Sequence, residues 1–159
     1  MSSKVSPVPE GFHTITPSLI VSDAAAAIEF YKSAFGAVEL VRLSTPDGSK
    51  VMHSSLKVGN SMFYVTDEFP EVAQESAPFP GGTSVSLNLY VDNADAAFAT
   101  AVQAGATAIM PVAEMFWGDR FGMVSDPFGH VWCFATRVRE PTLEEVREGA
   151  KAAFGSEGR

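Results

Sequence analysis

Landmarks in the first half of this 159-residue chain recur in the second half at one spacing. Val21 and Val91 stand 70 residues apart, and the same separation holds for Gly59 and Gly129, two glycines at predicted hairpins. Repetition at a fixed period indicates two copies of one supersecondary unit. Because the length suits a single domain, we predict one structural domain built from two similar modules.

Hydrophobic periodicity and turn residues predict the element order βαβββ for the first module. The predicted elements are a strand at 14–21, a helix at 24–35, and strands at 38–44, 50–58 and 61–66. Ser22 or Asp23 can cap the helix, and Gly36 ends it. Pro17 inside the first strand is typical of an edge or irregular position.

The second module is predicted to repeat this order. It has a strand at 83–91, a helix at 94–104 and three strands that end near Ala135. Thr142 and Glu145 form a capping box, which predicts a C-terminal helix. The predicted boundaries are a leader at 1–12, a first module at 13–67, a linker at 68–82, a second module at 83–139, and a C-terminal helix and tail at 140–159.

Composition narrows the classes of partner. Hydrophobic residues make up 46% of the chain, which is enough for a buried core. The net charge of −8 argues against nucleic acid, since phosphate binding needs clustered Lys and Arg. No apolar run approaches the roughly 18 residues of a membrane span. Cys133 is the single cysteine and no signal peptide is evident, so we expect a cytoplasmic protein with no membrane partner.

The order of several motifs resembles the vicinal oxygen chelate superfamily of glyoxalase, bleomycin-resistance and extradiol-dioxygenase proteins. The stretches that carry the likeness are Asp23 to Gly36 with Ile28-Glu29-Phe30-Tyr31, Val91-Asp92-Asn93-Ala94-Asp95 with Gly105-Ala106, and Asp126-Pro127-Phe128-Gly129-His130. Phe116-Trp117-Gly118-Asp119-Arg120 and Trp132 make the chain look most like the PhnB-type branch. The resemblance covers about 14–139.

The resemblance implies an α+β fold in which two βαβββ modules form a cupped mixed sheet, with helices outside and a ligand inside. It also implies a homodimer. Independently of it, Leu87, Leu89 and Val91 alternate with Ser86, Asn88 and Tyr90. This alternation indicates one apolar face packed on a helix and one more polar, concave face.

Metal-using relatives carry His and Glu ligands at four strand positions. Counting from Val21 and Val91, and from the two hairpin glycines, places Thr16, Phe63, Ser86 and Cys133 there. Such a set does not make a divalent metal site, because it holds neither a histidine nor a carboxylate. We therefore expect no metal and no other cofactor.

His53 is the candidate catalytic residue, because strand alternation brings it and Ser55 onto the concave face. A hydrogen-bonded structural histidine is the competing interpretation. His13 and His130 are expected to be exposed, and Cys133 is expected to be a small buried residue rather than a nucleophile. The candidate ligand-binding residues are Thr16, His53, Ser55, Phe63, Ser86, Asn88, Trp117, Arg120 and Cys133.

Trp117 and Arg120 belong to the segment that joins two predicted strands, where they could contact a ligand at the rim. A salt bridge between Asp119 and Arg120 that stabilises the hairpin is the alternative explanation.

Three functional hypotheses remain open. The first is a metal-independent protein that binds a small organic molecule in the concave sheet. The second is an enzyme, an isomerase, lyase or dioxygenase, that uses His53 with a non-standard metal or as a metal-free acid or base. The third is a dimeric interaction module whose cup is filled core.

Overall fold

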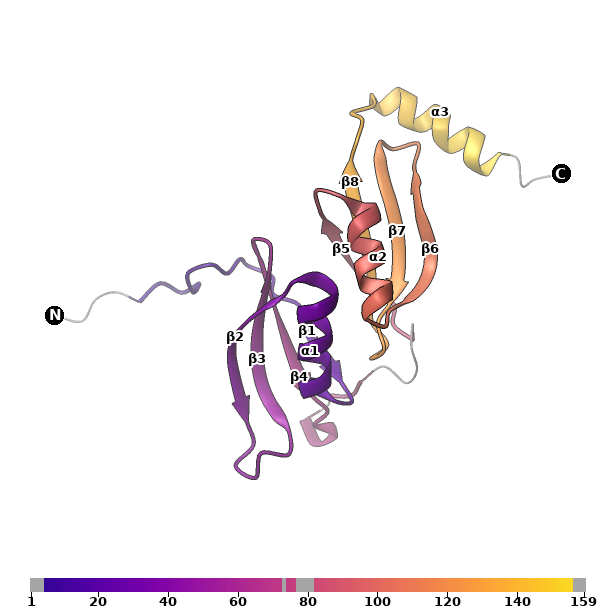
Figure 1. Cartoon of the computed structure of the whole chain (residues 1–159). Coiled ribbons are helices and arrows are strands. Elements are labelled where there is room, and N and C mark those ends of the chain that lie inside the picture. The colour runs from indigo at the N-terminus through magenta and orange to yellow at the C-terminus, as the bar shows by residue number, and fades with distance from the viewer. Residues whose placement is uncertain (1–4, 73, 77–81, 156–159) are drawn as a thin grey trace.

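The computed structural model describes residues 5–72, 74–76 and 82–155 (Figure 1). The ends of the predicted leader (1–4) and tail (156–159), and part of the predicted linker (73 and 77–81), lie outside the described residues. The first module contains β1 (Ser18–Val21), α1 (Ala24–Phe35), β2 (Val38–Ser44), β3 (Val51–Val58) and β4 (Ser61–Asp67). The predicted βαβββ order is therefore confirmed.

The second module repeats that order. It contains β5 (Ser86–Tyr90), α2 (Ala94–Ala104), β6 (Thr107–Glu114), β7 (Asp119–Ser125) and β8 (Val131–Arg137). Each first helix begins at a side-chain cap: Asp23 accepts a hydrogen bond from the Ala26 N–H, and Asn93 accepts one from the Ala96 N–H. These two caps fix the residue at which each helix begins.

Each module forms its own four-stranded mixed sheet, in the orders β1-β4-β3-β2 and β5-β8-β7-β6. The first strand of each module pairs parallel with the last, and the remaining pairs are antiparallel. β1 is shorter than predicted because Pro17 has no N–H to donate, although its carbonyl accepts a hydrogen bond from the Tyr64 N–H at 2.8 Å.

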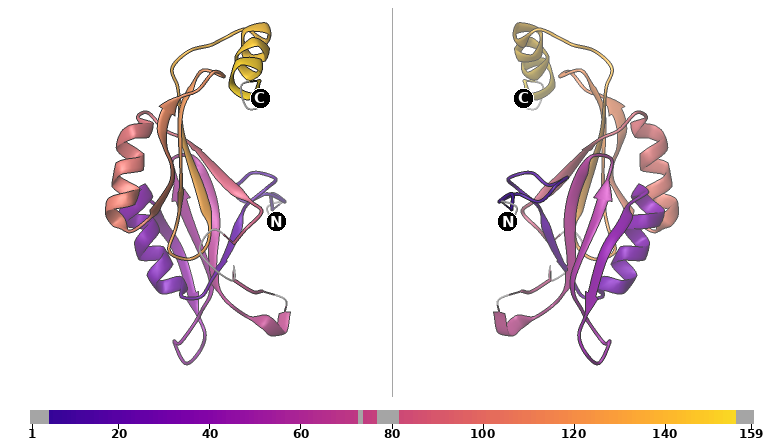
Figure 2. Two further views of the ribbon diagram at one scale, coloured as in Figure 1. Left: turned by 90° about the vertical axis from the view of Figure 1, so that its right-hand side faces the viewer. Right: turned by 90° about the vertical axis from the view of Figure 1, so that its left-hand side faces the viewer.

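The helices and the remaining segments lie on opposite sides of the sheets. α1 and α2 pack side by side on one face (Figure 2). The described part of the N-terminal segment, the short helix at Pro70–Val72 and α3 (Leu143–Phe154) lie on the other side. The structure is the expected α+β arrangement of two βαβββ modules.

An aromatic cluster fills the layer between helices and sheets. Tyr31 and Phe35 of α1 lie against Trp132, with ring centroids 5.4 and 4.5 Å away, and Phe63 lies 5.7 Å from the same ring. Phe134 lies 5.8 Å from Phe35. The cluster draws residues from both modules, so burial of these rings holds the two halves together.

A buried carboxylate also links the modules. Asp126 is fully buried at the turn between β7 and β8. It accepts hydrogen bonds from the Tyr31 hydroxyl at 2.6 Å, the Trp132 indole N–H at 2.9 Å, and the backbone N–H groups of Phe128 and His130. Tyr31 belongs to α1, so this contact joins the first module to the second.

The predicted C-terminal helix is present as α3 (Leu143–Phe154). Thr142 caps it, accepting a hydrogen bond from the Glu145 N–H. Within the predicted linker, a short 3-10 helix η1 spans Pro70–Val72, and Phe69 bridges to Gln74. Among the described residues, no helix combines the length and the hydropathy needed to cross a membrane.

Candidate functional site

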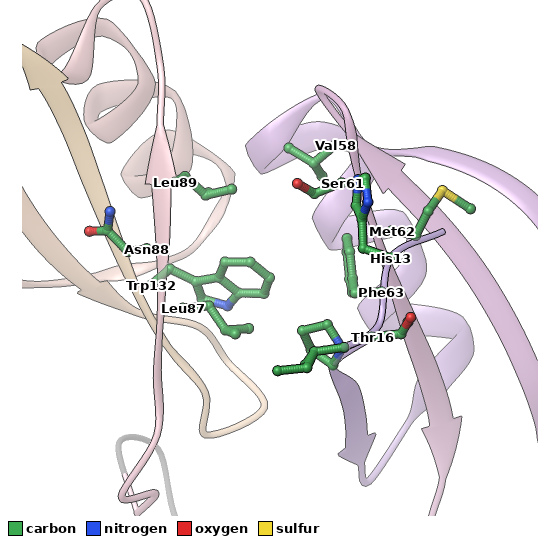
Figure 3. Close-up of a pocket in the computed structure, with 12 residues that line it drawn as sticks. His13, Thr16, Val58, Ser61, Met62, Phe63, Leu87, Asn88, Leu89 and Trp132 are labelled. Carbon is green, nitrogen blue, oxygen red and sulfur yellow. The ribbon is translucent and has the colours of Figure 1, made fainter. Parts of the chain in front are cut away.

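A pocket of about 250 Å³ opens between the two modules (Figure 3). One wall comes from β4 and the chain just before β1, and the other from β5 and β8. The lining residues are His13, Ile15, Thr16, Pro17, Val58, Ser61, Met62, Phe63, Leu87, Asn88, Leu89 and Trp132. The pocket therefore depends on both halves of the repeat being in place.

The lining of this inter-module pocket is mainly apolar. Phe63 and Trp132 meet edge to face, and Leu87 and Leu89 project toward them from β5 (Figure 3). Within the part of the chain that the structure describes, none of the lining side chains is Asp, Glu, Lys or Arg. Since a buried charge on a ligand would find no opposite charge here, the pocket suits an uncharged, largely apolar molecule.

Three of the predicted ligand-binding residues line the pocket, namely Thr16, Phe63 and Asn88. Sequence patterns had assigned Leu87 and Leu89 to a face packed on a helix. These leucines are only partly buried, because the pocket opens on that face at the junction of the modules. The alternation of residues along a single strand cannot predict a cavity that forms between two modules.

His53 and Ser55 lie elsewhere, on the face of β3 turned away from the helices. The His53 ring is 4.7 Å from Tyr64, which in turn lies 5.9 Å from Phe12. Nearby on β4, the Thr66 hydroxyl is buried and has no hydrogen-bond partner among the described residues. This polar face of the first module is separate from the inter-module pocket, whose lining does not include His53.

Ser86 and Cys133 come together in the second module, where β5 pairs with β8. Burial raises the pKa of the Cys133 thiol, and a hydrogen bond with Ser86 offsets part of that rise. A thiol with a raised pKa is mostly protonated near neutral pH, which agrees with a structural residue rather than a nucleophile.

Trp117 and Arg120, the two residues predicted at the rim, form hydrogen bonds with other residues of the same chain. Trp117 donates a hydrogen bond from its indole N–H to Asp119 at 3.2 Å. Arg120 forms a two-pronged pair with Asp95 of α2, at 2.7 and 2.9 Å, and this pairing lowers the pKa of Asp95. The arginine partner is thus on the helix beside β7, whereas the sequence had suggested Asp119.

The histidines differ from one another. His13 lies at the mouth of the pocket and is exposed, as the sequence predicts. The prediction that His130 is exposed is wrong: it is partly buried, with its Nε2 3.0 Å from the Ile20 carbonyl oxygen. Because Ile20 belongs to β1, this contact is a second polar link between the modules.

Strand register corrects the counting that located the family's metal positions. Cys133 pairs with Asn88 in the second module, whereas in the first module Ser18 pairs with Tyr64, not with Phe63. The two hairpin turns differ in length, so equal counting from their glycines reaches opposite faces of the sheet. With Tyr64 in place of Phe63, the positions still offer no histidine or carboxylate.

The residues present do not fit the metal that the family's enzymes use. Three hydroxyl groups and one thiol are a poor donor set for a divalent ion. Within 5–72, 74–76 and 82–155, no group of three or more His, Cys, Asp or Glu side chains is placed to hold one.

Comparison with known proteins identifies relatives. An uncharacterized protein of Mycobacterium bovis is 41% identical over 147 residues, covering 91% of this chain and 93% of that protein. The solved structure of an Arabidopsis thaliana gene product is 36% identical with a TM-score of 0.62, covering 78% of this chain and 98% of that one. A PhnB protein structure from Bacillus cereus, 18% identical, covers 78% of this chain and 99% of that one with a TM-score of 0.60, which shows a shared fold.

The family model described as the Glyoxalase/Bleomycin resistance protein/Dioxygenase superfamily matches residues 11–134, which span both modules. The match agrees with the paired βαβββ modules and with the motifs at α1 and at the last hairpin. The chain therefore belongs to the glyoxalase/bleomycin resistance protein/dioxygenase superfamily.

Proposed function

We propose that the protein binds a small, uncharged organic molecule between its two modules and does so without a metal ion. The observation that carries this proposal is the apolar pocket with an aromatic floor, whose described lining residues include no Asp, Glu, Lys or Arg. Its volume of about 250 Å³ is slightly below the range of typical ligand sites, so it fits a compact molecule of one or two rings.

Polar groups at the mouth would set the orientation of such a ligand. Ser61 and His13 stand at one wall, whereas the Asn88 side chain points away from the space between the walls (Figure 3). The Ser61 hydroxyl can donate or accept a hydrogen bond and carries no charge, and the His13 imidazole offers a second polar group. The expected ligand therefore carries one or two neutral polar atoms on an apolar body.

Titration with 6-propionyl-2-(dimethylamino)naphthalene, an uncharged fluorescent compound with two fused rings and one carbonyl group, tests the proposal. We expect saturable fluorescence enhancement with the unaltered protein. Ser61→Phe should weaken it at least tenfold, because the ring would enter the pocket from an exposed position. Ser49→Phe is the matched control, since Ser49 is an exposed turn residue outside this pocket.

Binding that is equal in the Ser61→Phe variant and its control would contradict the proposed site, and so would the absence of binding to the unaltered protein.

An alternative function, favoured by the unpartnered Thr66 hydroxyl beside His53 and Tyr64, is acid–base chemistry on the polar face of the first module. Binding or turnover lost in His53→Ala but kept in Ser61→Phe would favour that alternative. The cytoplasmic location and the homodimer stay predictions of the sequence.

A further inference from the structure

A second cavity, which we call the seam cavity, lies beside the inter-module pocket where the end of α1 meets α2. Its volume is about 190 Å³, and it shares the lining residues Val58 and Leu89 with the inter-module pocket. Figure 3 shows these two side chains on opposite walls at one end of that pocket. The residues that line the seam cavity come from both modules and are Ala34, Phe35, Gly36, Val58, Leu89, Val91, Ala97, Thr100 and Phe134. The two cavities therefore adjoin at Val58 and Leu89.

One row of side chains along β5 connects the two cavities. Leu87 lines the inter-module pocket, Leu89 lines both cavities, and Val91 lines the seam cavity. The Val91 N–H donates a hydrogen bond to the Ala135 carbonyl at 2.9 Å, so the pairing with β8 continues one residue beyond the end of β5. Alternate residues of an extended strand point to the same face. These three side chains therefore form a continuous apolar row from one cavity to the other.

The chain leaves this row incompletely covered. Several hydrophobic residues along the seam pack against the core and are still only partly buried, namely Phe35, Val58, Leu87, Leu89, Val91 and Ala97. Apolar surface that stays in contact with water is unfavourable, and covering it releases free energy in proportion to the area covered. A ligand that lay along the row would remove this surface from water.

The chemistry and the length of the row select the kind of ligand group that fits it. Thr100, which is exposed, is the one polar side chain among the described residues that line the seam cavity. A strand advances about 3.3 Å per residue, so Val91 lies about 13 Å beyond Leu87. An extended chain of about ten carbons has a similar length, since a carbon–carbon bond is about 1.5 Å long. A flexible methylene chain can follow this line past Val58 and Leu89 with little bulk.

We infer that the ligand carries an unbranched alkyl tail, which runs from the inter-module pocket along β5 into the seam cavity. This inference rests on the proposed function, because the tail extends a ligand whose ring-bearing, polar part occupies the inter-module pocket. The seam cavity then selects ligands by the length of the tail. Ala97 and Thr100 of α2 line the seam cavity and do not line the inter-module pocket, so they affect the tail and not the ring-bearing part.

Two fluorescent probes that differ only in the tail test the inference. The long-chain probe, 6-dodecanoyl-2-(dimethylamino)naphthalene, has the same rings and carbonyl group as the propionyl compound of the first titration. We expect the unaltered protein to bind the long-chain probe at least tenfold more tightly than the short-chain one, because each methylene group that is buried adds affinity.

Filling the seam cavity should remove this difference between the probes. Ala97→Phe places a ring in the seam cavity, so the long-chain probe should lose at least tenfold in affinity while the affinity for the short-chain probe stays unchanged. Ala99→Phe is the matched control, because Ala99 is an exposed residue of the same helix and lines neither cavity. The control should bind both probes as the unaltered protein does.

Thr100→Phe repeats the test at an exposed position of the seam cavity, where a larger side chain disturbs folding less than it does at the partly buried Ala97. The inference is overturned if the unaltered protein binds both probes equally, or if Thr100→Phe keeps the full preference for the long-chain probe that the Ala99→Phe control shows. Failure of the unaltered protein to bind either probe would contradict the proposed function, and this inference with it.

Discussion

Asp126 shows how a charged side chain can be accommodated in the interior of this protein. Its two carboxylate oxygens receive four hydrogen bonds, two from backbone N–H groups of its own turn and two from Tyr31 and Trp132. A buried carboxylate is tolerated when its lone pairs are satisfied in this way. Burial, and then the nearby Asp126 charge, raise the pKa of Tyr31 well above its usual range, so this hydroxyl remains a donor.

Tyr31→Phe should lower the free energy of unfolding by about 1–3 kcal/mol, because it leaves a buried carboxylate oxygen with one donor fewer. Urea unfolding monitored by tryptophan fluorescence measures the change. Tyr90→Phe is the control, since Tyr90 is 73% exposed.

The pKa of Tyr31 is raised on folding, so its contribution to stability is present below the ordinary tyrosine pKa of about 10 and is lost as the pH rises through the folded-state value. Equal stability of the two variants would show that the link is not stabilising.

The pair β6 and β7 depends on a glycine for its close approach. A Cβ on Gly122 would lie 2.7 Å from a methyl carbon of Val112 and 3.1 Å from the Val112 backbone nitrogen. Gly122→Ala should therefore destabilise the protein by about 1–3 kcal/mol through overpacking.

The double variant Gly122→Ala with Val112→Ala is the control for that prediction. Removing the methyl group gives the new Cβ room, so thermal unfolding should recover part of the loss relative to Val112→Ala alone. If Gly122→Ala unfolds at the same temperature as the unaltered protein, the packing explanation is incorrect.

Elements were predictable where local chemistry decides them. The bounds of α1 follow from the Asp23 cap and from Gly36, which adopts a positive φ of 68°. The strand predicted at 14–21 is longer than β1. The alternation of apolar residues extends to the N-terminal side of Pro17, but Pro17 has no backbone N–H to donate to the sheet. The facing of Phe63 and Tyr64 was not predictable by counting, because it depends on the pairing set by each turn. The pocket could not be predicted from the sequence, because Leu87 and Trp132 line a shared cavity only when the two modules pack together.

At the scale of the whole molecule, the donor set predicts that the protein holds no divalent metal. The positions that carry ligands in metal-using relatives present only hydroxyl and thiol groups here. Elemental analysis of the purified protein should find far less than one zinc, iron, manganese or nickel per chain. Addition of EDTA should leave the melting temperature unchanged, because a tightly bound ion would stabilise the folded state and its removal would lower that temperature. Stoichiometric metal would contradict the prediction.

The carboxylate of Asp126 also makes the two halves of the repeat unequal. In the first module the corresponding hairpin is the short Gly59-Asn60 turn, with Val58 paired to Ser61, and leaves no room for such a residue. Neither half can substitute for the other, because one supplies the acid and the other supplies the phenol that satisfies it. A chain built from two copies of the second module would bury the carboxylate without its phenol, and one built from two copies of the first would leave the phenol without its acceptor.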